Sequence, residues 1–288
     1  MASLSTRRLC FWLPALLVLL LAATSPAQPP VNLTTEQLIF RLRSAIEGLQ
    51  TMRCTMRAQE RMQGKIIQAR NLVKVNFRPL KVYIKKQDGI EVLWVTGQND
   101  GQAWVHLGRF PYLTLSLNPQ GTLMRRDQHH VALQAGFGPI AELLRPAGAG
   151  GESAFFRSLR YVGDTLLQGR PAHILRSDFP QFRYVSYTAG KNETPGTVAQ
   201  RFGCGDYRIM ERNNLAAEEK IAEGRVLQVP NAYGRRTTVC VDPNTFLPVL
   251  VHVVDEQGLY ERFEFVDVLA NQPIPAAEFT RTFSGYKF

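Results

Sequence analysis

The sequence predicts a β-rich α+β fold, in which one N-terminal helix precedes a large curved antiparallel sheet. Three observations support this prediction. A capped helical segment stands near the start, alternating apolar and polar residues fill most of the remaining chain, and Gly, Asn, Asp and Pro separate the alternating runs. Short strands joined by such turns are typical of an antiparallel meander. A chain of 288 residues is long enough to form a single core beneath such a sheet.

Residues 1–27 have the composition of a secretory signal peptide. Arg7 and Arg8 precede an apolar stretch at 11–23, and residues 25–27 (Ser-Pro-Ala) supply small side chains ahead of a cleavage site. The apolar stretch is short for a membrane-spanning helix. We therefore expect cleavage after Ala27 and a soluble mature protein in the periplasm.

The helix is expected directly after this segment. Thr34 and Gln37 form a capping box, the pairing of side chains and backbone N–H groups that starts many helices. The apolar residues that follow recur at helical spacing and share one face. These residues are Leu38, Leu42, Ala45, Ile46 and Leu49.

The strands are expected at close spacing along the rest of the chain. The first runs from Cys54 to a turn at 63–65, and a short helix at 140–144 and a flexible loop at 147–151 divide the series. The other strands are expected at 66–77, 81–85, 90–96, 102–107, 112–117, 159–163, 171–176, 183–185, 237–241, 247–254 and 260–269.

Residues 187–230 interrupt the sheet with a strand–helix–helix–strand (βααβ) unit. Thr194 followed by Pro195 is a strong helix start, because Thr caps free N–H groups and Pro at the first position has none to lose. Asp206 can cap the second helix, and 213–214 (Asn-Asn) can end it with left-handed geometry. Its two strands should pair, so we expect an insertion at a hairpin tip that can be removed at little cost to the sheet.

This unit resembles a LysM module, by which many bacterial envelope proteins hold peptidoglycan. The motifs are Tyr187 with Asn192-Glu193-Thr194, Val198-Ala199 with Phe202-Gly203, and Asn213-Asn214-Leu215 with Gly224, Leu227 and Val229-Pro230. The resemblance implies a glycan-binding groove with Asn192, Glu193, Thr194 and Pro195 on one wall and Asn214, Leu215 and Ile221 on the other. Asn-Glu stands where the family usually has Gly-Asp, and Pro195 stands where it often has Leu.

The flanking parts, 28–186 and 231–288, resemble a bacterial domain-of-unknown-function family related to the LolA/LolB lipoprotein carriers. The similar segments are Leu166–Pro171, Cys240–Pro248, the turn Asp255–Gly258, and Phe265 with Asn271–Pro275 and Phe279. In that superfamily a half-barrel sheet surrounds an apolar groove that receives acyl chains. The resemblance therefore implies a half-barrel and an apolar or acylated ligand.

The charge of the chain argues for some partners and against others. The net charge of +10 falls to +8 (10 − 2) when the two arginines of the signal peptide are removed. The unit at 187–230 is neutral, with six basic and six acidic residues, so the excess lies in the flanking parts. For an exported protein, an anionic membrane surface or wall polymer is a better candidate than nucleic acid, although a basic surface can also serve solubility alone.

No pattern of catalytic or metal-binding residues stands out. The five histidines show no ligand spacing, the serines lack a nucleophile elbow, and His129 and His130 are expected to be solvated. We therefore expect a non-enzymatic protein without metal or cofactor. Three cysteines remain after cleavage: Cys54, Cys204 and Cys240. The odd number leaves at least one thiol free, and a disulfide between Cys204 and Cys240 is possible.

Two functional hypotheses follow. In the first, the protein binds peptidoglycan through the LysM-like unit and an apolar, acylated ligand in the half-barrel. In the second, it is a wall-associated scaffold that binds a protein partner and no lipid; a hydrolase is a distant third. One set of aromatic side chains could line an apolar groove or belong to the core, and the core is favoured. This set is Phe77, Tyr83, Trp94, Trp104, Phe110 and Tyr112.

Overall fold

The computed structural model of the chain describes residues 33–144 and 154–288. The predicted signal peptide at 1–27 and the predicted loop at 147–151 lie outside the described residues. Within the described ranges, no helix is both long enough and apolar enough to cross a membrane.

Helix α1 (Thr35–Glu47) begins as predicted. Thr34 Oγ1 accepts a hydrogen bond from the Gln37 N–H at 3.2 Å, and Gln37 Oε1 accepts one from the Thr34 N–H at 3.0 Å. These two bonds pair N–H groups that a helix start leaves free. On the inner face, Leu38 and Leu42 are fully buried.

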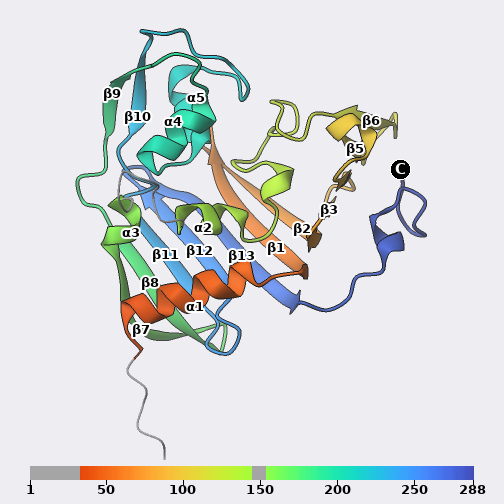
Figure 1. Cartoon of the computed structure of the whole chain (residues 1–288), viewed down its shortest axis with the longest axis horizontal. Helices are drawn as coiled ribbons and strands as arrows, with labels where there is room; N and C mark the ends of the chain where they lie inside the picture. Colours follow the sequence, from red (N-terminus) through yellow and green to blue (C-terminus); the bar gives the residue numbers. More distant parts are fainter. Residues whose placement is uncertain (1–32, 145–153) are drawn as a thin grey trace, which may run out of the picture. The chain divides into compact units, whose positions relative to one another are not determined.

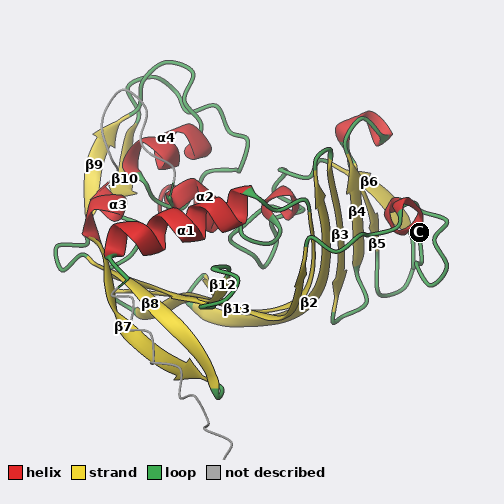
Figure 2. Cartoon of the chain, turned by 60° about the horizontal axis from the view of Figure 1, so that its bottom comes forward, coloured by secondary structure: helices red, strands yellow, loops and turns green. Residues whose placement is uncertain are grey.

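One curved antiparallel sheet of eleven strands forms most of the described fold (Figures 1 and 2). Its strand order is β6-β5-β4-β3-β2-β1-β13-β12-β11-β8-β7. Figure 2 shows α1 and α2 (Gly138–Leu143) on the concave side. The strands are β1 (Thr51–Met62), β2 (Lys65–Phe77), β3 (Leu80–Lys86), β4 (Glu91–Val95), β5 (Ala103–His106), β6 (Thr114–Leu117), β7 (Leu159–Leu167), β8 (Arg170–Asp178), β11 (Arg236–Val241), β12 (Pro248–Asp255) and β13 (Gly258–Ala270). Helix α3 (Ala154–Ser158) precedes β7.

The main core lies between the concave face of the sheet and the helices. Alternate residues of a strand point to the same face, and Met52, Cys54 and Ala58 of β1 are accordingly buried on the inner side. They join Leu38 and Leu42 of α1 in one apolar cluster. Burial of this face fixes the register of the central strands, because a shift by one residue would turn these side chains outward.

A second, smaller core lies on the other face of β3 and β4. Tyr83, Leu93 and Phe279 are buried there, and the ring of Tyr83 stacks on Tyr286 with centroids 3.9 Å apart. The C-terminal residues therefore cover this part of the outer face. Among the aromatic residues left open by the sequence, Phe77 and Trp94 contact the main core, Trp104 contacts the second core, and Phe110 and Tyr112 are 86% and 62% exposed.

The expected βααβ unit is inserted between two neighbouring strands of the sheet. It consists of β9 (Tyr184–Thr188), α4 (Pro195–Phe202), α5 (Asp206–Asn213) and β10 (Val226–Pro230). The strands β9 and β10 form a separate antiparallel pair, and the chain leaves β8 at Asp178 and returns at Arg236, which are paired. Of residues 183–185, which were expected in the main sheet, Tyr184 and Val185 instead begin β9.

Both helix starts of the inserted unit can be compared with the prediction. Thr194 is the N-cap of α4, and its Oγ1 accepts a hydrogen bond from the Thr197 N–H at 3.3 Å. Asn214 ends α5 in the left-handed conformation, as expected. The prediction for Asp206 was wrong: Gly205 is the N-cap, and the Asp206 carboxylate is drawn away by Arg125.

Candidate ligand pocket and its buried polar cluster

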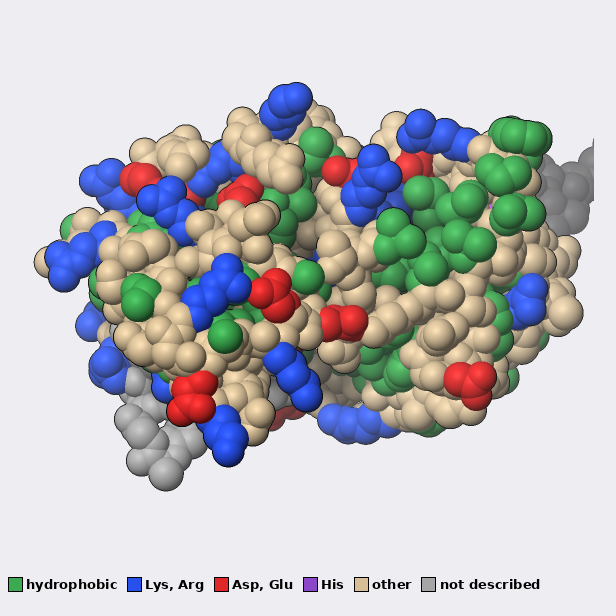
Figure 3. Space-filling model, turned by 90° about the horizontal axis from the view of Figure 1, so that it is seen from above, with side chains coloured by type: hydrophobic (Ala, Val, Ile, Leu, Met, Phe, Trp, Pro, Cys, Tyr) green, Lys and Arg blue, Asp and Glu red, His purple; other side chains and the backbone are tan. Residues whose placement is uncertain are grey.

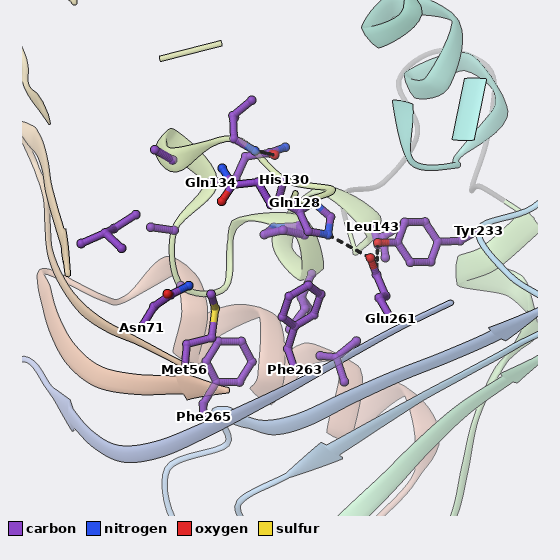
Figure 4. A pocket seen from close by; sticks show the side chains of 18 residues that line it. Met56, Asn71, Gln128, His130, Gln134, Leu143, Tyr233, Glu261, Phe263 and Phe265 are labelled. Carbon is purple, nitrogen blue, oxygen red and sulfur yellow. Dashed lines mark hydrogen bonds and ion pairs between the residues drawn. The ribbon is translucent and has the colours of Figure 1, made fainter. Parts of the chain in front are cut away.

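An apolar pocket lies between the concave face of the sheet and residues 128–143, which we call the roof (Figure 4). Its volume is about 70 Å³. Glu261, Phe263 and Phe265 reach it together because alternate residues of β13 point to one face. The remaining lining residues of the sheet are Met56, Asn71, Ile84 and Val251.

The roof is anchored to the sheet next to the pocket. Phe137 is fully buried, and its ring meets that of Phe265 with centroids 4.7 Å apart. Gly136 has a φ of +83°, and a Cβ there would come within 2.5 Å of Met52 Cε. A side chain at this position would strain the backbone, because its φ is positive, and would displace the end of the Met52 side chain. The roof residues above the pocket are mainly apolar and include Val131, Ala132, Ile140 and Leu143.

The polar end of the pocket is formed by Glu261. Its carboxylate accepts hydrogen bonds from His129 Nδ1 at 2.8 Å, from His130 Nε2 at 3.2 Å and from the Tyr233 hydroxyl at 2.5 Å. Burial alone would raise the pKa of Glu261, but the charge of His130 and the bonds from both histidines outweigh it and hold the pKa well below its usual range. Burial alone would lower the pKa of His130, and the Glu261 carboxylate instead holds it above its ordinary value.

His129 is part of the interior, contrary to the expectation that it is solvated. Only 2% of its surface is exposed, and its ring lies between those of Tyr207 and Tyr260, with centroids 4.6 Å and 4.2 Å away. Its second nitrogen, Nε2, is 3.1 Å from the carbonyl oxygen of Arg61. Both ring nitrogens thus face oxygen acceptors.

Glu60, His129 and Glu261 bring together groups that could ligate a metal. One ligand atom from each lies within 4.8 Å of the others, and carboxylate and imidazole groups suit zinc and related ions. Hydrogen bonds already use these groups, however, since Glu60 Oε1 accepts the His129 backbone N–H at 2.6 Å. Within the described residues the cluster is satisfied by protein donors, and we assign it a structural role.

Two ion pairs with buried arginines join the inserted unit to the sheet and to the segment just before the roof. Arg125, three residues before the roof, binds the Asp206 carboxylate through Nη1 and Nη2 at 2.6 Å and 2.7 Å. Arg208 Nη1 binds Asp255 of β12 at 2.6 Å, and both side chains are almost fully buried. Burial would raise the pKa of Asp206 and Asp255, but their arginine partners hold both below the usual range. Because Arg125 also donates to the His129 carbonyl, these pairs adjoin the polar end of the pocket.

The seven residues predicted to bind glycan lie on two loops of the inserted unit, and these loops meet. The Ile221 N–H donates to the Glu193 carbonyl at 2.8 Å. Asn192 and Asn214 are exposed with positive φ, and Thr194 is half-buried. These three side chains are accessible for contact with a ligand.

The other four side chains of that set are buried. Leu215 and Ile221 belong to the apolar core of the inserted unit, and Pro195 is buried at the start of α4. The Glu193 carboxylate accepts the Tyr187 hydroxyl and the Gly190 N–H, each at 2.8 Å. Any contact of these four residues with a glycan would therefore come from their backbone.

The possible Cys204–Cys240 bridge is absent. Cys54, Cys204 and Cys240 are all free thiols in the described structure. Burial raises the pKa of Cys54 and Cys204 to about 12, so neither thiol is ionised near neutral pH.

The sequence prediction missed the polar cluster. One signal was present, because Glu60 and Glu261 stand at inward positions of otherwise apolar alternation, beside Ala58 and Phe263. A charged residue on the buried face of a strand needs a partner. That partner is His129, which lies 69 and 132 positions away from them.

Comparison with known proteins finds one matching family model, which covers slightly less than half of the chain. Residues 49–191 match the DUF1571 family. The family is described as a protein of unknown function. The DUF1571 match runs from β1 to the first loop of the inserted unit, and no curated protein matches the chain.

Several solved structures resemble the described fold at low TM-score. The MucA/MucB complex of Pseudomonas aeruginosa matches with 16% identity and a TM-score of 0.40, over 85% of this chain and 60% of that chain. The lipoprotein LppX of Mycobacterium tuberculosis matches with 15% identity and a TM-score of 0.39, over 83% of this chain and 97% of that one. A LolA superfamily protein of Nitrosomonas europaea matches with 8% identity and a TM-score of 0.29, over 86% and 97%.

Proposed function

We propose that the chain is a non-enzymatic protein of the periplasm that holds an apolar, acyl-type ligand between the sheet and the roof. The observation that carries the proposal is the apolar pocket beneath the roof, with Glu261 and its hydrogen-bond donors at one end. Pockets with apolar walls and a few fixed polar groups are typical ligand sites.

Ligand entry requires the roof to move. Pockets for small molecules usually enclose about 300–1,000 Å³, whereas this pocket encloses about 70 Å³. The part of the roof that can move most easily is α2. This helix has only six residues, and no side chain caps its start. We expect α2 to shift outward when an acyl chain enters, while Phe137 stays anchored.

Filling the pocket tests this proposal. Ala135 lines it, so Ala135→Phe would occupy the space that the ligand needs. We expect this variant to lose binding of a fluorescent fatty-acyl probe, measured by titration. The matched control is Ala222→Phe, at an exposed position in the inserted unit. Unchanged binding by Ala135→Phe would contradict the proposed site, and a wild-type protein that binds no acyl probe would favour the alternative of a protein-binding scaffold.

A second proposed activity is peptidoglycan binding by the inserted unit. It is supported by the βααβ order and by the two meeting loops that expose Asn192 and Asn214. Asn214→Gly removes the amide but keeps the left-handed backbone. We expect this variant to co-sediment less with purified peptidoglycan, whereas Asn99→Gly, at another positive-φ position, should bind as the wild type does. Equal co-sedimentation of Asn214→Gly and the wild type would argue against this groove.

The proposal also includes contact with an anionic membrane surface, where acyl ligands are found. Five consecutive residues, Arg109–Leu113, are exposed at the loop between β5 and β6 and combine a basic with aromatic and apolar side chains. On the face of the molecule seen in Figure 3, hydrophobic side chains gather toward one end, with Lys and Arg side chains beside them. Aromatic and basic residues together are typical of surfaces that settle at a bilayer interface.

A further inference from the structure

Besides Glu261, the floor of the pocket holds a second polar side chain, Asn71, where the strand pattern predicts an apolar one. Asn71 of β2 shares its face with Val73 and Val75, which belong to the main core, and only 6% of its surface is exposed. It is paired across the sheet with Met56, and Figure 4 shows the two side by side at the pocket.

The carboxamide oxygen of Asn71 lacks a hydrogen-bond donor. Within the described residues, no backbone or side-chain group donates to its Oδ1, although that atom is buried. The other polar side chains of the pocket are engaged: Gln134 Oε1 accepts the Val131 N–H at 3.2 Å, and Gln128 Nε2 donates to the Met124 carbonyl at 2.8 Å. A buried acceptor without a donor destabilises a fold, so each case requires an explanation.

The charges around the pocket restrict the ligand further. Among the described lining residues, His130 is the one side chain that can carry a positive charge, and it is bonded to Glu261. A carboxylate or phosphate would therefore enter an apolar space that contains an anion and no uncommitted cation. Such a burial of unpaired charge is strongly unfavourable.

We infer that Asn71 selects an uncharged apolar ligand whose polar group donates a hydrogen bond, such as a hydroxyl or an amide N–H. This inference rests on the proposed function, because it names the ligand class of the same pocket. The donor of the ligand meets Asn71 Oδ1, and the Asn71 amide N–H group remains able to bond an oxygen of the same ligand. A hydroxyl supplies both partners.

Competition between ligands of equal chain length tests this inference. A bound apolar dye, 1-N-phenylnaphthylamine, is displaced from the full mature protein by dodecanol, by dodecyl methyl ether or by dodecanoate. We expect dodecanol to bind about five- to tenfold more tightly than the ether, which corresponds to one added hydrogen bond. Dodecanoate should bind more weakly than dodecanol.

The variant Asn71→Leu should bind dodecanol and the ether equally, and it should melt at a higher temperature without ligand because the unpaired oxygen is gone. Asn76→Leu, on the same strand, should keep the wild-type preference. A wild type without preference for dodecanol, or an Asn71→Leu variant that retains it, would overturn the inference while leaving the pocket intact. Absence of any dye binding would instead contradict the proposed function and the inference with it.

Discussion

Arg208 of the inserted unit lies over the ring of Tyr260 in the sheet, with its guanidinium carbon 3.3 Å from the ring centroid. The same side chain donates to Asp255 at 2.6 Å. A guanidinium held between an aromatic face and a carboxylate stabilises a buried junction through both contacts. The inserted unit is thus tied to the sheet, and the expectation that it can be removed at little cost neglects this junction.

Removing the guanidinium should therefore destabilise the whole fold. Arg208→Met leaves the buried Asp255 carboxylate with Arg61 as its remaining arginine partner. Breaking a buried ion pair typically costs about 3–5 kcal/mol, and we expect about 3 kcal/mol here because one partner remains. Urea unfolding would measure the loss. Arg212→Met, at an exposed position of the same helix, should change the free energy of unfolding by about 0.5 kcal/mol or less.

The pocket cluster should make stability depend on pH in two directions. The pKa of His130 is raised above 6.5, so its contribution is complete below that pH and is lost as the pH rises through the higher folded value. The pKa of Glu261 is lowered from 4.5, so its contribution is present above that pH and is lost as the pH falls. The groups that act on His130 are the carboxylates of Glu261, Glu60 and Asp206. The cluster should stabilise most between about pH 4.5 and 6.5.

Unfolding measured at several pH values would check this window. His130→Gln should lose stability relative to the wild type near pH 6, and the difference should shrink as the pH rises toward 9. His252 is a control of opposite sign, because burial lowers its pKa. His252→Gln should therefore gain stability relative to the wild type as the pH falls. A constant difference for His130→Gln would show that its ion pair does not contribute.

Thr194 should matter for the inserted unit more than for the sheet. Thr194→Ala removes the cap of α4, and such losses cost about 1 kcal/mol. Hydrogen exchange should show faster exchange in the first turn of α4 and unchanged exchange in β1 and β13. Unchanged exchange in α4 would mean that the cap does not hold the helix start.

The exposed loop at 109–113 should control attachment to membranes. We expect the double variant Phe110→Ser/Tyr112→Ser to associate less with anionic vesicles, and Arg109→Gln to reduce the salt dependence of that association. Phe40→Ser is the matched control, since Phe40 on α1 is 62% exposed, as Tyr112 is. Equal loss of vesicle association in Phe40→Ser and the loop variant would point to general surface hydrophobicity rather than to this loop.

The strands and caps could be predicted because local patterns specify them. Alternation placed Cys54 and Ala58 on one face of a strand, the capping box at Thr34 set the start of α1, and Thr194 set the start of α4. The polar cluster of Glu60, His129 and Glu261, and the ion pair beside it, could not be predicted in the same way. Asp206 has the sequence context of a cap, and its partner Arg125 lies 81 positions earlier. The tertiary fold decides which polar partner such a side chain contacts. Local sequence periodicity carries no information about contacts between residues so far apart.

Photolabelling tests the central claim, an acyl ligand beneath the roof, most directly. A fatty acyl amide that carries a diazirine along its chain would be bound to the mature protein, irradiated, and its attachment sites mapped by mass spectrometry. We predict labels on pocket residues such as Met56, Leu143 and Phe263, and their loss when Ala135→Phe fills the pocket. Labels confined to the exposed loop at 109–113, or labels at the pocket that persist in the filled variant, would contradict the proposal.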